Sequence, residues 1–238
     1  MSKEYMFSLG KELEKKINSS IKDQLDLIKL CLETSRAIIT ECSDTKEVSS
    51  NEDEGFRIVY PNREIGRRMQ RIFFYNRYED VNDKSMFTIQ SFVYPLKIVK
   101  KEDNKFKIFG DFPKVGKLEF NATVISRLVT IINIIKKDEQ SWGDSWVEEL
   151  IDLLHGKNDY IETTLLFYIV NEFLTFDFGY LRFDKDPKHV AVNHPICHID
   201  CHLDKRATYK IGLDAEMNIS QFLDLIDNGS SVRYIKDK

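Results

Sequence analysis

The chain has 238 residues, of which 42% are hydrophobic and 31% are charged. This composition is typical of a globular protein with room for one large core or two small ones. Glycine and proline are scarce, at 10 and 5 copies, which argues against long disordered or collagen-like segments. The formal net charge of −4 argues against a surface covered by nucleic acid, although a local basic patch stays open.

Three features bear on the cellular compartment. Residues 1–22 are polar and charged and do not have a basic stretch followed by an apolar one, so no secretory signal is expected. The most apolar run, 124–135, is interrupted by polar residues and is shorter than the ~20 residues needed to cross a bilayer. The four cysteines lack zinc-ribbon spacing and are expected to be reduced thiols. We therefore predict a cytoplasmic protein without a membrane segment.

Helical periodicity predicts a long N-terminal helical segment over residues 1–42, as one helix or two. Apolar residues recur there every three or four positions: Leu9, Leu13, Ile17, Ile21, Leu25, Ile28 and Leu32. This stripe packs on the body of the protein, or it binds a protein partner or a second copy of the chain. Residues 43–55 are acidic and nearly free of apolar side chains, which predicts a linker. Residues 56–238 are then expected to form a single domain.

The next segment predicts a short strand over 56–60 and an amphipathic helix from Arg63 to Tyr78. One side of this helix carries apolar residues and the other carries arginines. Aromatic residues follow the arginines directly along the chain. A row of arginines with aromatic rings nearby suits single-stranded nucleic acid or a phosphorylated partner, although a solvated helix face is the commoner outcome of such a pattern. The candidate phosphate-binding residues of this segment are Arg63, Arg67, Arg68 and Arg71.

The remaining elements alternate between runs of strands and runs of helices. Residues 87–101 are rich in β-formers, with 106–109 as a partner strand across a turn. Pro95 indicates an edge or a bulge. Helices are expected over 124–136 and after two capping boxes near Ser145 and Asp159. Strands then return over 176–183, 196–203 and 207–213, and a last helix begins at Asn218 with Gln221 as its reciprocal cap. The predicted class is α+β, with a largely antiparallel sheet and a helical layer.

The most informative segment is 194–204, a turn and a strand, because it holds three of the five histidines. Successive side chains of a strand point to opposite faces. His198, Asp200 and His202 therefore share one side with Asp204, while Cys197, Ile199, Cys201 and Leu203 share the other. The cysteine side is expected to be core. Neighbours on the histidine side lie about 7 Å apart, so two of them can reach one metal ion.

Several chemistries fit this histidine side. One divalent ion such as zinc, manganese, iron or nickel would suit imidazole and carboxylate ligands. Without a metal, His198 or His202 would act as general base and Asp200 would fix its tautomer. His194 could join from the turn before Pro195. A polar, solvent-facing strand without any function is the commoner explanation of such a pattern.

The preceding strand ends in Arg182 and Asp184. If the two strands pair as a hairpin, Arg182 could bind an anion and Asp184 could complete a carboxylate pair beside the histidines. Asp186, before Pro187, is better explained as turn chemistry. The sequence contains no Walker-type or dinucleotide glycine loop, no nucleophile elbow, no kinase signature and no helical zinc-protease motif, which disfavours the usual nucleotide-dependent enzymes.

The C-terminal region resembles a bacterial domain-of-unknown-function family. In that family an Arg-(Phe/Ile)-Asp-x-Asp-Pro segment precedes His-Pro-x-x-His, a strand, and a helix with Phe-(Leu/Ile)-x-x-Ile. The matching residues are Arg182, Asp184, Asp186, Pro187, His194, Pro195, His198, Phe222, Leu223 and Ile226. The chain departs from the pattern at 206–208, where Arg-Ala-Thr replaces an arginine–proline step. The resemblance implies no activity, but it implies a bacterial intracellular protein of the kind found in defence or toxin-type gene neighbourhoods.

Two functional hypotheses follow. The first is a non-catalytic subunit or interaction protein of a multi-protein system, of an anti-phage defence or toxin type, whose N-terminal helices bind the partner. The second is a His/Asp-based hydrolase or nuclease that acts on a phosphodiester, with or without a metal. Its catalytic candidates are His194, His198, Asp200 and His202, with Arg182 and the arginine helix holding the anionic substrate.

Overall fold

The computed structural model describes residues 4–18, 21–40, 55–59, 70–79, 85–103, 105–137, 160–202 and 208–226. The fold is α+β, and the chain forms two compact units that do not follow its order. The first unit contains 1–9, 48–94 and 178–238, and the second contains 10–47 and 95–177. The expected linker, 43–55, lies outside the described residues except for Gly55. The expected division at residues 42 and 55 therefore stays a prediction.

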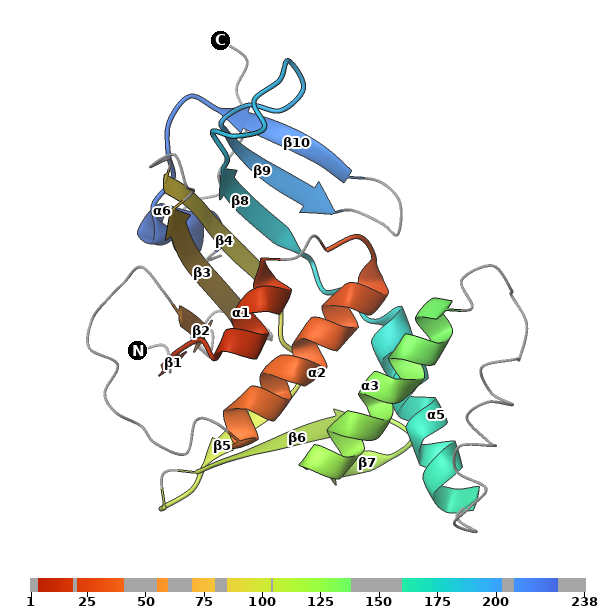
Figure 1. The fold of residues 1–238 in the computed structure, drawn as a ribbon. Coiled ribbons are helices and arrows are strands. Elements are labelled where there is room, and N and C mark those ends of the chain that lie inside the picture. Colours follow the sequence, from red (N-terminus) through yellow and green to blue (C-terminus); the bar gives the residue numbers. More distant parts are fainter. Residues whose placement is uncertain are drawn as a thin grey trace. The chain divides into compact units, whose positions relative to one another are not determined.

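The first unit is built on a seven-stranded sheet in which all neighbouring strands are antiparallel, as the sequence predicts. The strand order is β1-β2-β3-β4-β8-β9-β10 (Figure 1). The strands are β1 (Glu4–Phe7), β2 (Gly55–Val59), β3 (Arg71–Glu79), β4 (Ser85–Val93), β8 (Leu181–Lys185), β9 (Cys197–His202) and β10 (Thr208–Leu213). Strand β8 thus inserts between β4 and β9, so the two halves of the sheet come from distant parts of the sequence.

One face of this sheet packs against the last helix, α6 (Ile219–Ile226). The odd-numbered residues of β3, β4, β8 and β9 form an apolar cluster that includes Phe183, Ile199, Cys197 and Cys201, and Phe222 of α6 completes it. The predicted capping box starts the helix. The Gln221 backbone N–H donates to Asn218 Oδ1 (2.8 Å), and the Asn218 backbone N–H donates to Gln221 Oε1 (2.9 Å).

The second unit combines four described helices with a three-stranded antiparallel sheet, β5-β6-β7. These elements are α1 (Lys11–Ile17), α2 (Gln24–Thr40), α3 (Ala122–Lys137), α5 (Tyr160–Thr175), β5 (Lys97–Lys100), β6 (Phe106–Phe112) and β7 (Gly116–Glu119). The predicted pairing across the turn is confirmed for β5 and β6. The first part of the predicted stretch 87–101 instead belongs to β4 in the other sheet. Polar contacts tie the helices together: Gln24 Nε2 donates to the Phe176 carbonyl (2.9 Å), and Lys29 Nζ donates to Asn133 Oδ1 (2.8 Å). Within the described residues, no helix combines the length and apolarity that spanning a membrane requires.

The predicted long N-terminal helical segment forms only in part. The described residues contain two separate helices there, α1 and α2, but residues 4–7 form strand β1, which pairs along β2. Residues 5–7 are Tyr-Met-Phe, and pairing with β2 overrides the weak helical period there. The stripe residues Leu13, Ile17, Ile28 and Leu32 are buried, so they contribute to the core of this chain.

The predicted helix from Arg63 to Tyr78 is wrong over its second half, since residues 71–79 form β3. The run Ile72-Phe73-Phe74-Tyr75 is β-branched and aromatic, which favours a strand. Ile72 and Phe73 are adjacent, so in a strand they point to opposite faces, and both are buried.

Candidate functional site

The face of the sheet opposite α6 changes character across its width. Over β1 to β4 it carries a row of aromatic rings, with Phe7 stacked on Phe56 at 4.8 Å and Phe74 following at 5.5 Å from Phe56. Over β8 to β10 it becomes polar. The strand register aligns two rows of side chains there: Gln90, Arg182, Asp200 and Lys210 in one, and Thr88, Asp184, His198 and Gly212 in the other.

The polar side chains of β8, β9 and β10 form one ionic cluster, which we call the polar network: Arg182, Asp184, His198, Asp200 and Lys210. Arg182 Nε donates to Asp184 Oδ1 at 2.7 Å. Lys210 Nζ donates to Asp200 Oδ1 at 2.6 Å and to His198 Nε2 at 3.0 Å. The imidazole Nε2 also lies 3.8 Å from Asp184 Oδ2 and 3.9 Å from Asp200 Oδ1. Two carboxylates and one ammonium group therefore lie around the imidazole Nε2, and Arg182 holds one of the carboxylates.

The hydrogen bonds of His198 fix its tautomer. Its Nδ1 lies 2.8 Å from the Pro195 carbonyl oxygen, which only accepts, so Nδ1 must carry the proton. Nε2 then has a lone pair, which accepts from the Lys210 ammonium. The residue is 0% exposed. The Nε2 lone pair of His198 is thus directed into the polar network.

The other members of the network are shielded from water but not sealed. The side chains of Arg182, Asp184 and Asp200 are 16%, 13% and 19% exposed. Burial acts to lower the pKa of Arg182, but the neighbouring charges, that of Asp184 first, and the hydrogen bond to Asp184 together outweigh burial and raise that pKa above its ordinary value. Beside them, the Tyr180 hydroxyl donates to Gln90 Oε1 at 3.0 Å, and burial raises the pKa of Tyr180.

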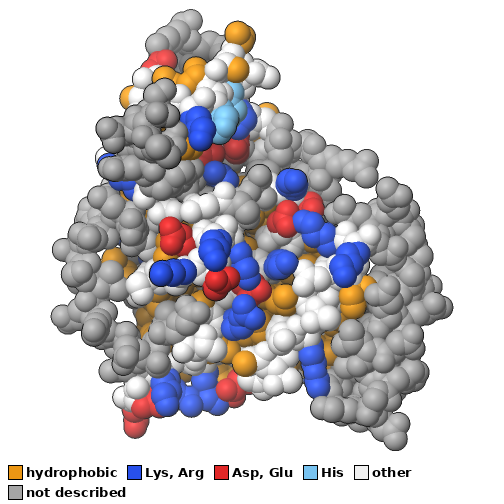
Figure 2. Space-filling model, in the orientation of Figure 1, with side chains coloured by type: hydrophobic (Ala, Val, Ile, Leu, Met, Phe, Trp, Pro, Cys, Tyr) orange, Lys and Arg blue, Asp and Glu red, His pale blue; other side chains and the backbone are white. Residues whose placement is uncertain are grey.

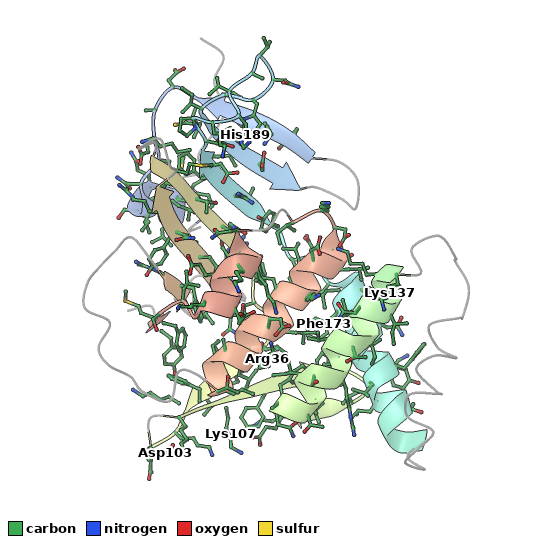
Figure 3. All side chains as sticks on the ribbon, in the orientation of Figure 1. Arg36, Asp103, Lys107, Lys137, Phe173 and His189 are labelled. Atoms are coloured by element: carbon green, nitrogen blue, oxygen red, sulfur yellow. The ribbon has the colours of Figure 1, made fainter. Side chains whose placement is uncertain are left out.

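Residues 186–196, here called the β8–β9 loop, stand over this end of the sheet and are held by a set of hydrogen bonds. The Asp186 backbone N–H donates to the Ile196 carbonyl (2.8 Å), and the backbones of Ala191 and His194 bond each other in both directions (3.1 and 2.9 Å). Asp186 Oδ2 also contacts His189 Nδ1 at 2.8 Å; Figure 3 labels His189. The loop is therefore an ordered hairpin-like structure.

Two histidines of the β8–β9 loop extend the line of rings that starts at His198. The ring of His194 meets the ring of His198 edge-on, with centroids 4.5 Å apart, and the ring of His189 lies 6.5 Å from that of His194. His194 Nδ1 is buried and has no hydrogen-bond partner among the described residues. Histidine side chains are visible beside charged ones of both signs in Figure 2.

The β8–β9 loop and the adjoining edge strand also carry exposed apolar side chains. Val190 is 53% exposed, Val192 107%, and Ile196 and Tyr209 each 46%. Among the described residues only Met6 is a further large hydrophobic with comparable exposure. Exposed apolar residues are ordinary when scattered singly. Here three of the five lie on one loop, whereas Tyr209 pairs with Cys201 at the other end of β9.

The structure brings together most of the histidine-strand candidates. His198 and Asp200 share a side of β9, and Arg182 and Asp184 face them from β8, as the hairpin hypothesis predicts. Cys197 and Cys201 lie in the core, as expected. The histidine side is not solvent-facing, however, since His198 is completely buried. His202 lies in β9 opposite Thr208, but its side chain and all of Asp204 lie outside the described part. The catalytic roles of these residues stay predictions.

Of the predicted arginine row, only Arg71 lies among the described residues. Arg71 lies on β3, where its Nε donates to Ser91 Oγ (3.1 Å) and its guanidinium donates to the Gly179 carbonyl (2.7 Å). These bonds tie β3 to β4 and to the segment before β8. Arg63, Arg67 and Arg68 fall outside the described residues, so their contact with nucleic acid or phosphate stays a prediction.

Sequence reasoning missed Lys210, the cation at the centre of the network. The sequence does contain a signal for it. Residues 207–213 are predicted as the strand that follows the histidine strand, and if the two strands pair, alternation can place Lys210 on the same face as His198 and Asp200. The partner Gln90 of Tyr180 could not be found this way, because β4 is distant in the sequence.

Comparison with known proteins adds no further information, since no protein family model, curated protein or solved structure matches this chain. The resemblance of the C-terminal region to a domain-of-unknown-function family therefore stays an expectation.

Proposed function

We propose that this protein is a non-catalytic interaction subunit of a multi-protein system, and that it binds a protein partner through the β8–β9 loop. The setting implied by the resemblance is a bacterial defence or toxin-type system. The observation that carries the proposal is the gathering of Val190, Val192 and Ile196, all well exposed, on one ordered loop. The N-terminal stripe first considered for the partner is largely buried, so the loop is the better surface.

The loop is held in one conformation by its own hydrogen bonds, and this favours binding in addition to its apolar character. A loop that is ordered before binding loses little conformational entropy when it binds. The backbone bonds between Ala191 and His194 and between Asp186 and Ile196 provide that order. Lys188 and His189 are held as well, because their backbone N–H groups donate to Asp186 Oδ1 at 3.0 and 3.2 Å. The valines are thus presented in a fixed position, which suits insertion into an apolar pocket.

Loss of the Val192 contact should weaken partner binding by a predictable amount. Complete burial of a valine side chain contributes about 1.5 kcal/mol or more, and a difference of about 1.4 kcal/mol corresponds to roughly tenfold in Kd. Val192→Asp should therefore weaken partner binding at least about tenfold. Asn193→Asp adds the same charge at the neighbouring exposed position and should change Kd by less than about threefold.

The experiment has two stages. A photo-reactive amino acid at position 192, with position 216 as the control site, identifies the partner in cells of the source organism. The purified pair is then titrated with the unmodified chain, Val192→Asp and Asn193→Asp. Equal cross-linking from both positions, or an unchanged Kd for Val192→Asp, would overturn the proposal. Cross-links only to a second copy of this chain would replace the multi-protein system by a homo-oligomer.

A second candidate is a His/Asp-based hydrolase of phosphodiesters, favoured by the convergence of the polar network. His198 Nε2 is the general base of this candidate, and Arg182 and Lys210 would bind the anionic group. The test is hydrolysis of single- and double-stranded oligonucleotides with magnesium, manganese or zinc. His198→Gln should lose about a hundredfold or more in rate, while the exposed His189→Gln should not. Absence of hydrolysis by the unmodified protein under all three conditions retires this candidate.

A further inference from the structure

We propose that Asp184, His198 and Asp200 bind one divalent transition-metal ion, and that the Lys210 ammonium takes the place of this ion when none is bound. One ligand atom from each of the three residues lies within 4.8 Å of the others. An ion at their centre would need only small side-chain movements, since metal–ligand distances to nitrogen and carboxylate oxygen are about 2.0–2.2 Å. The inference concerns the polar network alone and does not depend on the docking role of the loop.

The imidazole is already in the state that a metal requires. A histidine ligand must present an unprotonated nitrogen, and its other nitrogen usually donates to a carbonyl or a carboxylate that fixes the ring. The bond from His198 Nδ1 to the Pro195 carbonyl provides that arrangement. Nε2 is thereby directed toward Asp184 Oδ2 and Asp200 Oδ1.

The carboxylates are supported in the same way. Arg182 holds Asp184 through Oδ1 at 2.7 Å, which leaves Oδ2 as the oxygen nearer to His198. This contact fixes the carboxylate without using the oxygen assigned to the ion. Asp200 is held by Lys210 through the oxygen that lies 3.9 Å from Nε2.

The position of Lys210 indicates that the site stabilises a cation. Its Nζ contacts both His198 Nε2 and Asp200 Oδ1, so it occupies the position where an ion would meet these two ligands. The side chain comes from the edge strand β10 and is 32% exposed. A flexible lysine stem at an edge can turn toward water and release both ligands. Metal and ammonium therefore compete for the same position.

The ligand set indicates the class of ion. One imidazole with two carboxylates suits zinc or manganese better than calcium, which prefers six to eight oxygen ligands. Three protein ligands leave coordination positions for water. Cys197 and Cys201 do not contribute, because they point to the opposite face of β9 into the apolar cluster.

The test is titration of the full chain with zinc or manganese salts, followed by calorimetry. We expect one equivalent to bind. Lys210→Met should bind at least about tenfold more tightly, because no ammonium has to leave. Asp200→Asn and His198→Gln should bind at least tenfold more weakly. His189→Gln is the matched control, since its ring contacts Asp186 outside the network, and it should stay within threefold.

Two outcomes would overturn the proposal: no stoichiometric binding to either the unmodified chain or Lys210→Met, or equal binding by His198→Gln. The absorption spectrum of the chain with cobalt bound provides a second criterion. Bands from thiolate ligands would show that cysteines hold the metal instead of Asp184, His198 and Asp200. If the variants fail to fold, manganese-induced broadening of backbone amide signals in the unmodified chain decides. Broadening centred on Asp184 and Ile199 supports the site, and broadening elsewhere overturns it.

Discussion

The contact between Lys210 and Asp200 gives the sharpest stability prediction. Lys210→Met keeps the aliphatic stem but removes the ammonium, which lies 2.6 Å from Asp200 Oδ1 and 3.0 Å from His198 Nε2. Exposed ion pairs contribute about 0.2–1 kcal/mol, whereas breaking a buried pair costs about 3–5 kcal/mol. This pair is 32% and 19% exposed, so it falls between these limits. We expect the free energy of unfolding to fall by about 2 kcal/mol.

A double-mutant cycle separates the pair from other effects of the substitution. Lys210→Met and Asp200→Asn, alone and together, are unfolded in urea and followed by circular dichroism, with chelator present. The coupling energy should be about 1 kcal/mol. The control cycle uses Lys15 and Glu12, whose ion pair is 74% and 76% exposed and should couple weakly. Equal coupling in both cycles would refute the reasoning that partial burial strengthens the network contact.

Three further predictions test the sheet, the last helix and the β8–β9 loop. Phe183→Ala removes a ring that is 0% exposed in the apolar cluster and should lower the free energy of unfolding by about 3–5 kcal/mol; a loss below 1 kcal/mol in urea unfolding would show that the cluster is loosely packed. Asn218→Ala removes the cap of α6 and should cost about 1 kcal/mol, while Asn218→Ser should restore most of it; an equal loss in both variants would exclude capping as the cause. Burial acts to raise the pKa of Asp186, but the hydrogen bonds from His189 and from the backbone outweigh it and lower that pKa below 3.8. The charged carboxylate therefore stabilises the fold above pH 3.8, and this contribution is lost as the pH falls through the lower folded pKa. Asp186→Asn should flatten the acid side of the stability curve, measured by urea unfolding between pH 2 and 6, and an unchanged curve would contradict the assignment.

The predictable parts of the fold are those whose local pattern agrees with their packing. The alternation of Cys197, Ile199 and Cys201 with His198 and Asp200 indicates a strand with one apolar face, and the apolar cluster confirms it. The Asn218 and Gln221 cap also forms as predicted, because a capping box depends only on nearby residues.

The errors arise where long-range pairing decides the structure. Residues 4–7 join β2, and residues 71–79 pair on both sides with β2 and β4. Neither pairing can be inferred from a helical count of apolar positions. The same holds for the site: the β8–β9 hairpin is local and predictable. The contact of Tyr180 with Gln90 instead joins segments that are separated in the sequence by residues 95–177 of the second unit.

The interleaved order of the two units has a consequence during synthesis. Strand β4 leaves the ribosome long before β8, because residues 95–177 are translated between them. Until then the nascent chain contains β4 without the neighbour that lies beside it in the folded protein, and such an edge invites pairing with other chains. The polar network and the β8–β9 loop are completed later still, so a truncated product would lack both.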